Sequence, residues 1–488
     1  MVKGSFQPWK RLGQLFFTAC FVVPLLLPTN HLEGTYLKLI VAWVAPIFLM
    51  LWTFNYQLLL SLPRSKTLLP IAVPTLFLWI VDTLALQRGT WAIESGTKLG
   101  IHVWPHLEIE EAVFFLVTNA MIVLGSCAFD NALAILDAFP SIFTTVPGMP
   151  GPLLMLQSLF TPTSRYDQER LDGLQNALTV LSKKSRSFYL ASGVFGGRLR
   201  IDLILLYGFC RIADDLIDDA ASSEEAETWI VHFKTFLDTM YSRTRSEASL
   251  DKALFPFPPT AQKVLRLLPV DKLPSQPLYE LLDGFRMDLD FSTEKAAADP
   301  PIQTEQDLER YATCVAATIG ELCTSLVYAH DPDKHMIGAH DNRDECTQAA
   351  VRMGRVLQYI NIVRDVNTDA ETGRCYIPHQ WMTAAKQSGS AAETEAERFA
   401  CRKRILDTAF QGYAANRDAI EELPAYARGG IRVAVESYVE IGRTLRKRMQ
   451  NGEPLDFAGG GKAGRASVPK LRRVWVGWRT MAGRRGSI

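Results

Sequence analysis

The stretch that decides the fold of this chain is Leu203-Ile-Leu-Leu-Tyr-Gly-Phe-Cys-Arg-Ile-Ala-Asp-Asp-Leu-Ile-Asp-Asp219. It holds four aspartates in six positions, and they follow an apolar run with no proline and one glycine. As a helix, the stretch places four side chains on one face, at spacings of three and four residues: Tyr207, Arg211, Asp214 or Asp215, and Asp218. Carboxylates one turn apart destabilise a helix. The pattern therefore indicates either a solvated acidic helix end or a site that binds a compensating cation.

A second acidic stretch favours the cation site. It reads Gln358-Tyr-Ile-Asn-Ile-Val-Arg-Asp-Val-Asn-Thr-Asp369, and its polar residues again fall on one helical stripe. The opposite side of this helix is apolar, with Val356, Ile360 and Val363. Two apolar helices that each bring an Asp-x-x-x-Asp pair can face one another across a bundle, as they do in bundle metal sites.

The chemistry of these ligands predicts both the metal and the substrate. Oxygen-only ligands select a hard cation, Mg²⁺ or Mn²⁺. Mg²⁺ held by few carboxylates usually completes its coordination with water and substrate phosphates. We therefore expect a diphosphate substrate and the following metal ligands: Asp214, Asp218, Asp365 and Asp369.

Length and composition set broad limits. At 488 residues, the chain is long enough for two or three domains. The formal net charge is zero, so nothing in the charge balance indicates a nucleic-acid partner. The eight cysteines show no C-x-x-C spacing, which is typical of free thiols in a reducing compartment.

Four apolar segments fill the first part of the chain: 12–27, 37–62, 68–86 and 112–136. Segments of about 20 residues suit helices that span a bilayer, and interior prolines are tolerated there. We therefore predict a multi-pass transmembrane helical domain of about four spans over residues 1–137, in contact with the lipid bilayer. The distribution of Lys and Arg around the spans predicts that the N-terminus and everything after residue 137 face the cytosol.

The remainder predicts a second, helical domain behind a linker. Prolines with Ser, Thr and Gly between them dominate residues 138–163, which is typical of a linker. From 164 to 488 the pattern is one of helices broken by short loops, without a sustained period-two strand pattern. The predicted fold class is therefore all-α.

The acidic stretches also carry a family resemblance. Arg211-x-x-Asp-Asp-x-x-Asp218 and Gln358-x-x-Asn-x-x-Arg-Asp-x-x-x-Asp369 resemble the paired motifs of the head-to-head prenyl synthases, the phytoene and squalene synthases. Three further segments fit the same pattern in the same order: Ser185-Arg-Ser-Phe-Tyr189, Tyr311-Ala-Thr-Cys-Val-Ala-Ala-Thr-Ile-Gly320 and Gly373-Arg-Cys-Tyr-Ile-Pro378. The resemblance covers most of the second domain and implies an isoprenoid-synthase-type helical bundle.

This resemblance implies a prenyltransferase that condenses two geranylgeranyl diphosphates, through prephytoene diphosphate, to phytoene, with Mg²⁺ and without NADPH. Arg211 and Arg364 are then expected either to contact diphosphate oxygens or to orient the aspartate carboxylates. Tyr207 is expected among the catalytic residues. The cationic intermediate needs a dry pocket, for which the family match supplies Phe188, Tyr311, Val315, Ala316, Gly320, Gln358 and Asn361. Ordinary helix packing would explain each aromatic or small residue of this set on its own.

Two alternatives to a phytoene synthase stay open. Within the resemblance, a squalene or dehydrosqualene synthase would use farnesyl diphosphate, and squalene synthase also uses NADPH. In a different class, the chain would be a non-catalytic membrane scaffold with a degenerate synthase domain. A scaffold predicts damaged metal ligands, but both aspartate pairs and their flanking arginines are intact.

The C-terminal tail is basic. Between residues 459 and 488 there are eight Lys or Arg and no acid, with Trp475 and Trp478 among them. One interpretation is contact with anionic lipid. In the other, implied by a match to the family's basic C-terminal segment, Lys470, Arg472 and Arg473 close over a diphosphate.

The membrane part carries a second resemblance. Pro105-His-Leu-Glu-Ile-Glu-Glu-Ala-Val-Phe-Phe115 is similar to the Pro-x-Glu-Glu-x-x-x-Phe-Phe motif of membrane lycopene cyclases, so the whole chain resembles the fungal bifunctional lycopene cyclase/phytoene synthases. The resemblance implies cyclisation of lycopene to γ- and β-carotene, with Glu110 and Glu111 as candidate proton donors. An acidic helix N-terminus, favoured by the helix dipole, would look the same.

The cyclase motif departs from the family pattern in two ways. Glu108 stands where the family has proline, and Pro105 lies three positions earlier. The family also has two homologous half-domains, each with an acidic motif, and only the second is recognisable here. A lone half is compatible with an inactive cyclase, with pairing to a second copy of the chain, and with a truncated gene model. Association with other carotenoid enzymes is a further expectation.

Overall fold

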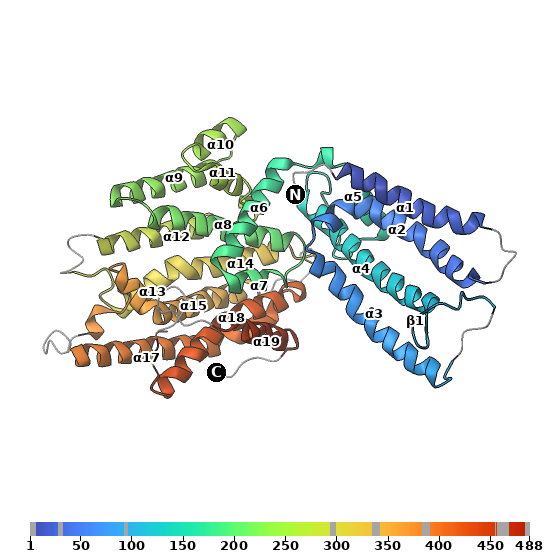
Figure 1. The fold of residues 1–488 in the computed structure, drawn as a ribbon. Coiled ribbons are helices and arrows are strands. Elements are labelled where there is room, and N and C mark those ends of the chain that lie inside the picture. The colour runs from blue at the N-terminus through green and yellow to red at the C-terminus, as the bar shows by residue number, and fades with distance from the viewer. Residues whose placement is uncertain are drawn as a thin grey trace. The chain divides into compact units, whose positions relative to one another are not determined.

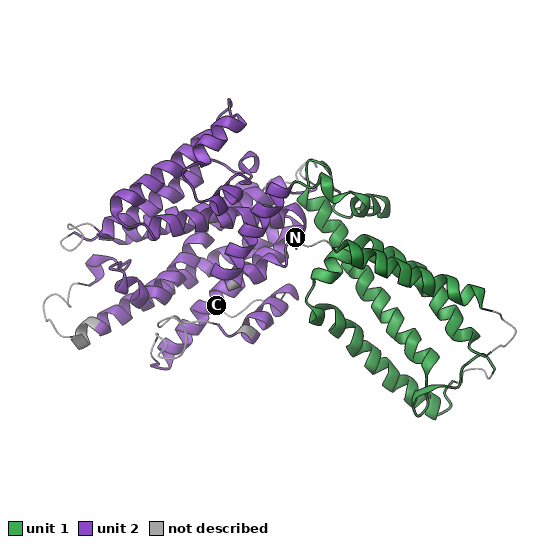
Figure 2. Cartoon of the chain, turned by 45° about the horizontal axis from the view of Figure 1, so that its top comes forward, with its two compact units in different colours: residues 1–167 green, residues 168–488 purple. Residues whose placement is uncertain are grey.

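The computed structural model describes residues 6–27, 33–91, 96–292, 299–333, 342–382, 391–453, 455 and 468–483. The chain divides into two compact units, Met1–Asp167 and Gln168–Ile488 (Figure 2). Among the described residues, the secondary structure is helical apart from one two-stranded hairpin (Figure 1). The predicted all-α class is confirmed.

The first unit is built on four long helices: α1 (Gln7–Leu26), α2 (Thr35–Ser61), α3 (Arg64–Gln87) and α4 (Ile109–Ala138). A short hairpin leads into α4 and consists of β1 (His102–Trp104) and β2 (Leu107–Glu108). Polar side chains join the helices within their apolar surroundings. Asn131 on α4 donates to Asn55 on α2 at 2.9 Å, and Asn119 on α4 donates to Thr75 on α3 at 3.1 Å. Such bonds are a common means of holding membrane helices together.

Three of these helices, α2, α3 and α4, are long and apolar enough to cross a membrane. Large apolar side chains stay exposed along α3, among them Leu68, Val73 and Phe77, which is the surface that a lipid-facing helix presents. Helix α1 is less apolar because its first turns carry Lys10 and Arg11. The fourth segment that meets the same length and hydropathy criteria, Glu305–Ala329, lies in the second unit and packs inside its bundle.

The residues predicted as a linker contain a helix. Helix α5 (Pro152–Phe160) begins with proline, which is well suited to the first turn of a helix. It packs in the first unit, where the Ser158 hydroxyl donates to the Ala132 carbonyl of α4 at 3.2 Å. The rings of Phe160 and Phe54 lie edge to face, with their centroids 4.5 Å apart. A 3₁₀ turn, η1 (Thr163–Arg165), follows.

The second unit is a bundle of α-helices. The α-helices are α6 (Gln168–Lys184), α7 (Arg186–Ser192), α8 (Gly197–Asp218), α9 (Ser223–Tyr241), α10 (Glu247–Leu254), α11 (Pro259–Leu265), α12 (Gln276–Leu289), α13 (Glu305–Ala312), α14 (Thr318–Ala329), α15 (Arg343–Glu371), α17 (Ala391–Asn416), α18 (Ala425–Gln450) and α19 (Lys470–Met481). The 3₁₀ turns are η2 (Val270–Lys272), η3 (Asp290–Ser292), η6 (His379–Trp381) and η7 (Arg417–Glu422). A π-helical turn, η5 (Thr313–Ala317), joins α13 to α14.

Two apolar clusters hold the bundle together. One gathers the buried sides of α8, α9 and α12, with Phe209, Phe233 and Phe236 fully buried. The other surrounds α15, α17 and α18, with Val363, Tyr413 and Val439 at its centre. Because α8 and α15 each bury one apolar side in a cluster, their acidic ends are left at the edge of the core.

Candidate active site

The four predicted metal ligands lie near the C-terminal ends of two helices. Asp214 and Asp218 belong to the last turns of α8, which ends at Asp218. Asp365 and Asp369 belong to the last turns of α15, which ends at Glu371. Asp365 is buried at 8% exposure, whereas Asp218 is exposed.

Arginines pair with these carboxylates. One terminal nitrogen of Arg211 lies 2.7 Å from Asp214, and the other lies 2.5 Å from Asp215. On α15, Arg364 donates through Nε and Nη2 to the two oxygens of Asp365, at 2.7 and 2.6 Å. Two-pronged pairs of this kind fix the orientation of both partners. Arg211 and Arg364 therefore orient the candidate ligands.

A third arginine brings the two acidic helix ends together. Arg374 donates from Nη2 to Asp218 Oδ1 at 2.8 Å, and its backbone N–H donates to the Asp369 carbonyl at 2.9 Å. The end of α8 and the end of α15 thus meet at one residue, which binds the first through its guanidinium and the second through its backbone N–H. Arg374 lies in the Gly373–Pro378 motif, although the sequence pattern assigns it no role.

The donor set fits a hard divalent cation, since every candidate ligand is a carboxylate. In the part of the chain that the structure describes, no group of three or more His, Cys, Asp or Glu converges closely enough to hold a metal. The described contacts of three candidates run instead to guanidinium groups: Asp214 to Arg211, Asp365 to Arg364 and Asp218 to Arg374. A cation between the two rows would take over part of these contacts.

Asp214 illustrates why the acidic end attracts positive charge. Burial raises the pKa of this carboxyl to about 6, and the negative charge of Asp218 adds to the increase while Arg211 opposes it. Repulsion between neighbouring carboxylates disfavours their charged forms. Each positive group placed beside Asp214 and Asp218 relieves that repulsion.

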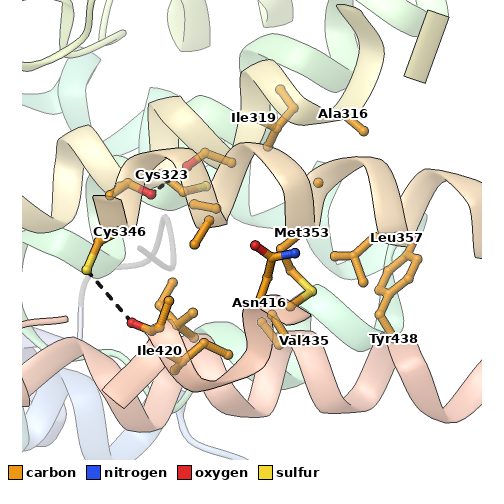
Figure 3. Close-up of a pocket in the computed structure, with 18 of the residues that line it drawn as sticks. Ala316, Ile319, Cys323, Cys346, Met353, Leu357, Asn416, Ile420, Val435 and Tyr438 are labelled. Atoms are coloured by element: carbon orange, nitrogen blue, oxygen red, sulfur yellow. Dashed lines mark hydrogen bonds between the residues drawn. The ribbon is translucent and has the colours of Figure 1, made fainter. Parts of the chain in front are cut away.

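Beside the acidic ends lies an apolar cavity of about 270 Å³ (Figure 3). Its wall on α15 is a continuous helical stripe: Cys346, Ala349, Ala350, Met353, Gly354, Leu357, Gln358 and Asn361. Residues of α14, α18, η5 and η7 complete the wall, among them Ile319, Val435 and Tyr438. Because Asn361 lies one turn before Asp365 on α15, the polar end of the cavity is next to the acidic row.

Six of the predicted pocket residues line this cavity: Phe188, Val315, Ala316, Gly320, Gln358 and Asn361. Tyr207 lies behind Phe188, with ring centroids 6.0 Å apart in an edge-to-face arrangement. Burial raises the pKa of Tyr207 to about 12, so this hydroxyl keeps its proton. Tyr311 is buried and does not line the cavity.

Local backbone features shape the wall. Val315 and Ala316 belong to the π-helical turn η5, a feature that often marks functional sites. Gly320 is explained by close packing, since a Cβ there would lie 2.3 Å from the Ala350 carbonyl oxygen of α15. On α15, a Cβ at Gly354 would likewise lie 2.4 Å from the Ala316 carbonyl oxygen of η5, which leads into α14. Both glycines thus let α14 and α15 approach each other beside the cavity.

Sequence reasoning missed a buried acid beside this site. Asp288 on α12 accepts hydrogen bonds from the hydroxyls of Tyr311 and Tyr376, at 3.2 and 2.7 Å, and the two rings stack at 4.6 Å. Burial raises the pKa of Asp288 to about 7. The signal was present in the sequence, because Asp288 continues the buried stripe of Leu281 and Phe285 at helical spacing.

Of the three basic residues expected to close over a diphosphate, the structure describes the side chains of Arg472 and Arg473. Arg472 on α19 donates to Glu440 on α18 at 2.8 Å, and neither residue lines the cavity. Arg473 lies on the same helix, and the side chain of Lys470 lies outside the described set.

In the first unit, buried acids gather where α4 begins. Glu110 is fully buried; its Oε1 accepts the Leu99 N–H at 2.7 Å, and its Oε2 has no hydrogen-bond partner among the residues that the structure describes. Glu111 accepts the hydroxyl of Tyr36 on α2 at 2.9 Å. Asp82 of α3, also buried, accepts the Trp91 indole at 3.1 Å. Buried acids within membrane segments are candidates for a functional site.

Glu108, the residue that departs from the cyclase motif, is part of the same group. It precedes α4 in an extended conformation and forms an ion pair with Lys98. It lies near enough to Asp82 and Glu111 to act on them electrostatically. Glu108 therefore adds a further acid to the group, and Lys98 is its ion-pair partner.

Known proteins are similar to this chain both in its second unit and over nearly its whole length. Residues 181–472 match the family described as Squalene/phytoene synthase. Bifunctional lycopene cyclase/phytoene synthase from Phaeosphaeria nodorum is 49% identical over 485 residues, which cover 97% of this chain and 80% of the relative. The protein of the same name from Neurospora crassa is 44% identical over 467 residues, covering 91% of this chain and 75% of the relative.

Solved structures give more distant matches. A dehydrosqualene synthase in complex with ligand has a TM-score of 0.48 and 21% identity, and the match covers 65% of this chain and 98% of that one. Squalene synthase HpnC from Alicyclobacillus acidocaldarius has a TM-score of 0.43 and 19% identity, with 59% and 97% covered. On the strength of the sequence relatives and the matched family, this chain belongs to the bifunctional lycopene cyclase/phytoene synthase family, with a squalene/phytoene synthase domain in its second unit.

Proposed function

We propose that the chain is a carotenoid-biosynthesis enzyme that forms phytoene from two geranylgeranyl diphosphates in its second unit and cyclises lycopene in its first. The observation that carries the proposal is a long apolar cavity whose polar end adjoins two aspartate-bearing helix ends. An allylic diphosphate has this same division, with a charged head and an apolar tail.

The acidic ends would bind the diphosphate head. Asp214, Asp218, Asp365 and Asp369 would hold Mg²⁺, which supplies Lewis-acid stabilisation of the departing diphosphate when bound. The arginines that now pair with the carboxylates can turn to phosphate oxygens as the cation takes their place. Arg374 is best located for this, because it already touches both helix ends.

The cavity would protect the carbocation that remains. Its wall is mainly apolar, and Phe188 stacks on Tyr438 at 5.1 Å near the polar end. Aromatic faces stabilise a cation, and exclusion of water prevents its capture. Asp288 would act indirectly, by holding Tyr311 and Tyr376 in place. The proposed reaction needs no reductant, so NADPH is not expected.

The length of the cavity favours geranylgeranyl over farnesyl chains. Its α15 stripe runs from Cys346 to Asn361, and 15 residues at a rise of about 1.5 Å span roughly 22 Å. Carbon–carbon bonds of about 1.5 Å advance an extended chain by roughly 1.25 Å each, so the 16 main-chain carbons of a geranylgeranyl group need about 20 Å. A farnesyl group needs about 15 Å and would leave the Cys346 end empty.

A bulky residue at that end should therefore change substrate preference. We expect Ala350→Phe to lower kcat/KM for geranylgeranyl diphosphate relative to farnesyl diphosphate by at least about tenfold, because Phe would fill the space of the fourth isoprene unit. Gln348→Phe is the matched control, since Gln348 is exposed on the same helix. An equal loss for both substrates would contradict this assignment of the cavity.

The first unit would carry out the cyclisation. Glu110 and Glu111 are the proposed proton donors to a terminal double bond of lycopene, because a low-dielectric surrounding keeps a carboxylic acid protonated. The four helices of this unit, α1 to α4, would span the bilayer, with the N-terminus and the second unit in the cytosol. This location suits both lycopene and phytoene, which are apolar hydrocarbons.

One experiment separates this function from its alternatives. Membranes that contain the protein are given either geranylgeranyl diphosphate or farnesyl diphosphate, with Mg²⁺ and without NADPH, and the hydrocarbon is identified by chromatography and mass spectrometry. We expect phytoene, and cyclised carotenes when lycopene is added. A product formed only from farnesyl diphosphate would favour a squalene or dehydrosqualene synthase, and the absence of any product would favour a scaffold.

A further inference from the structure

Helix α19 leaves a row of large apolar side chains in solvent. Leu471, Val474, Trp475, Trp478 and Met481 are all at least 49% exposed. The indole rings of Trp475 and Trp478 stack with their centroids 5.0 Å apart. Five large apolar side chains on three turns of one helix form a surface that a soluble protein rarely leaves uncovered.

The other side of α19 is firmly attached to α18, so the exposed row has a fixed orientation. Val476 and Thr480 are fully buried. The Thr480 carbonyl accepts a hydrogen bond from Arg432 at 3.2 Å, and Arg472 binds Glu440 at 2.8 Å. Polar contacts at both ends of the helix therefore hold it against α18.

The charge of this segment indicates what covers the row. Helix α19 contains Lys470, Arg472, Arg473 and Arg479 and no acid, and the sequence has no acid over residues 459–488. Part of this charge is held inside the unit, because Arg472 is half exposed but pairs with Glu440 and the Nε and Nη2 atoms of Arg479 are buried. Exposed tryptophans beside arginines are typical of helices that lie in the headgroup region of a bilayer. A protein partner of matching apolar shape would not require a basic segment without acids, whereas an anionic lipid surface favours one.

We propose that the exposed side of α19 is a membrane-binding surface that inserts its apolar row into a bilayer rich in anionic lipid. Helix α18 carries α19 on one face and part of the cavity wall on another, with Ile431, Val435 and Tyr438 lining the cavity. The lipid surface then lies one helix away from the cavity. If the proposed function holds, this arrangement shortens the path of an apolar product into the bilayer.

The test measures the surroundings of the two α19 tryptophans within the full-length protein. Wild type and the double variant Trp475→Phe/Trp478→Phe are reconstituted in vesicles with brominated acyl chains, which quench tryptophan at membrane depth. Phenylalanine keeps the surface apolar, so the difference in emission between the two proteins reports these two positions. Trp381→Phe is the control, because Trp381 is covered by the Arg404 guanidinium at 3.9 Å. No substrate is present, so a failure here is independent of the proposed function.

We expect the Trp475/Trp478 emission to be quenched at least twofold more in vesicles with phosphatidylglycerol than in pure phosphatidylcholine, and less in high salt. The Trp381→Phe difference should not respond to lipid. Emission that no brominated lipid quenches, whether or not it is accessible to iodide in solution, would overturn the proposal. Protection from both quenchers would show that protein, from this chain or a second copy, covers the row instead.

Discussion

Replacement of Asp214 or Asp365 by alanine is expected to abolish phytoene formation, with a loss of at least about 10²–10³-fold in kcat. Each change removes a carboxylate from one of the two acidic helix ends and weakens both metal binding and the charge balance at the diphosphate. The measurement is the rate of hydrocarbon formation from geranylgeranyl diphosphate with Mg²⁺, at equal amounts of membrane-inserted protein.

The two positions differ in what the alanine leaves behind in the fold. After Asp214→Ala, Arg211 keeps its ion pair with Asp215. Asp365 is buried against Arg364, so Asp365→Asn is the gentler second variant and removes the charge while keeping the volume. Asp283→Ala is the matched control, because it breaks an exposed ion pair with Lys234 on the surface of the same unit. Wild-type turnover in the Asp214 or Asp365 variants would refute their assignment as metal ligands.

Glu110→Gln is expected to stop lycopene cyclisation, with a loss of at least about 10²-fold, while phytoene forms at the wild-type rate. Glutamine preserves the hydrogen bond that Leu99 donates but has no acidic proton to give. The Oε2 of Glu110, buried and without a hydrogen-bond partner in the described part of the chain, is the atom best placed to carry that proton. The measurement is the yield of cyclised carotene from lycopene in the same membranes that are assayed for phytoene.

Two further variants test whether the loss of cyclisation is specific to Glu110. Asp130→Asn provides the control, since Asp130 is an exposed acid toward the other end of α4. Glu111→Gln tests the second candidate, whose carboxylate is already engaged by Tyr36. Unchanged cyclisation in both glutamine variants would assign the proton donor to another residue, with Asp82 and Glu108 as the remaining buried acids.

The sequence predicted the acidic helices well because their information is local. Apolar residues at helical spacing predicted α8 and α15, and the aspartates fell on one face of each by the same geometry. The π-helical turn η5 was not predicted, since periodicity alone cannot separate it from an α-helix. Helix α5 was missed because the prolines around it resemble a linker, although the one at its start favours a helix.

The partners of each site residue depend on tertiary packing and could not be predicted. The Gly373–Pro378 motif marked Arg374, but no local pattern connects it to Asp218, which lies more than a hundred residues earlier. Similarly, Tyr311 matched a family pocket position, yet its hydroxyl is directed at Asp288. The metal ligands remain a prediction, because the described carboxylates are paired with arginines rather than gathered around one point.

The central claim is that the two acidic helix ends act through a divalent cation on a diphosphate, and metal removal tests it most directly. Purified protein in lipid nanodiscs is freed of metal with EDTA and given geranylgeranyl diphosphate, and phytoene is measured before and after the addition of excess Mg²⁺. We predict no phytoene in EDTA and full recovery with Mg²⁺ in the wild type, with no recovery in Asp365→Asn. Phytoene formation at an undiminished rate in EDTA would contradict the account.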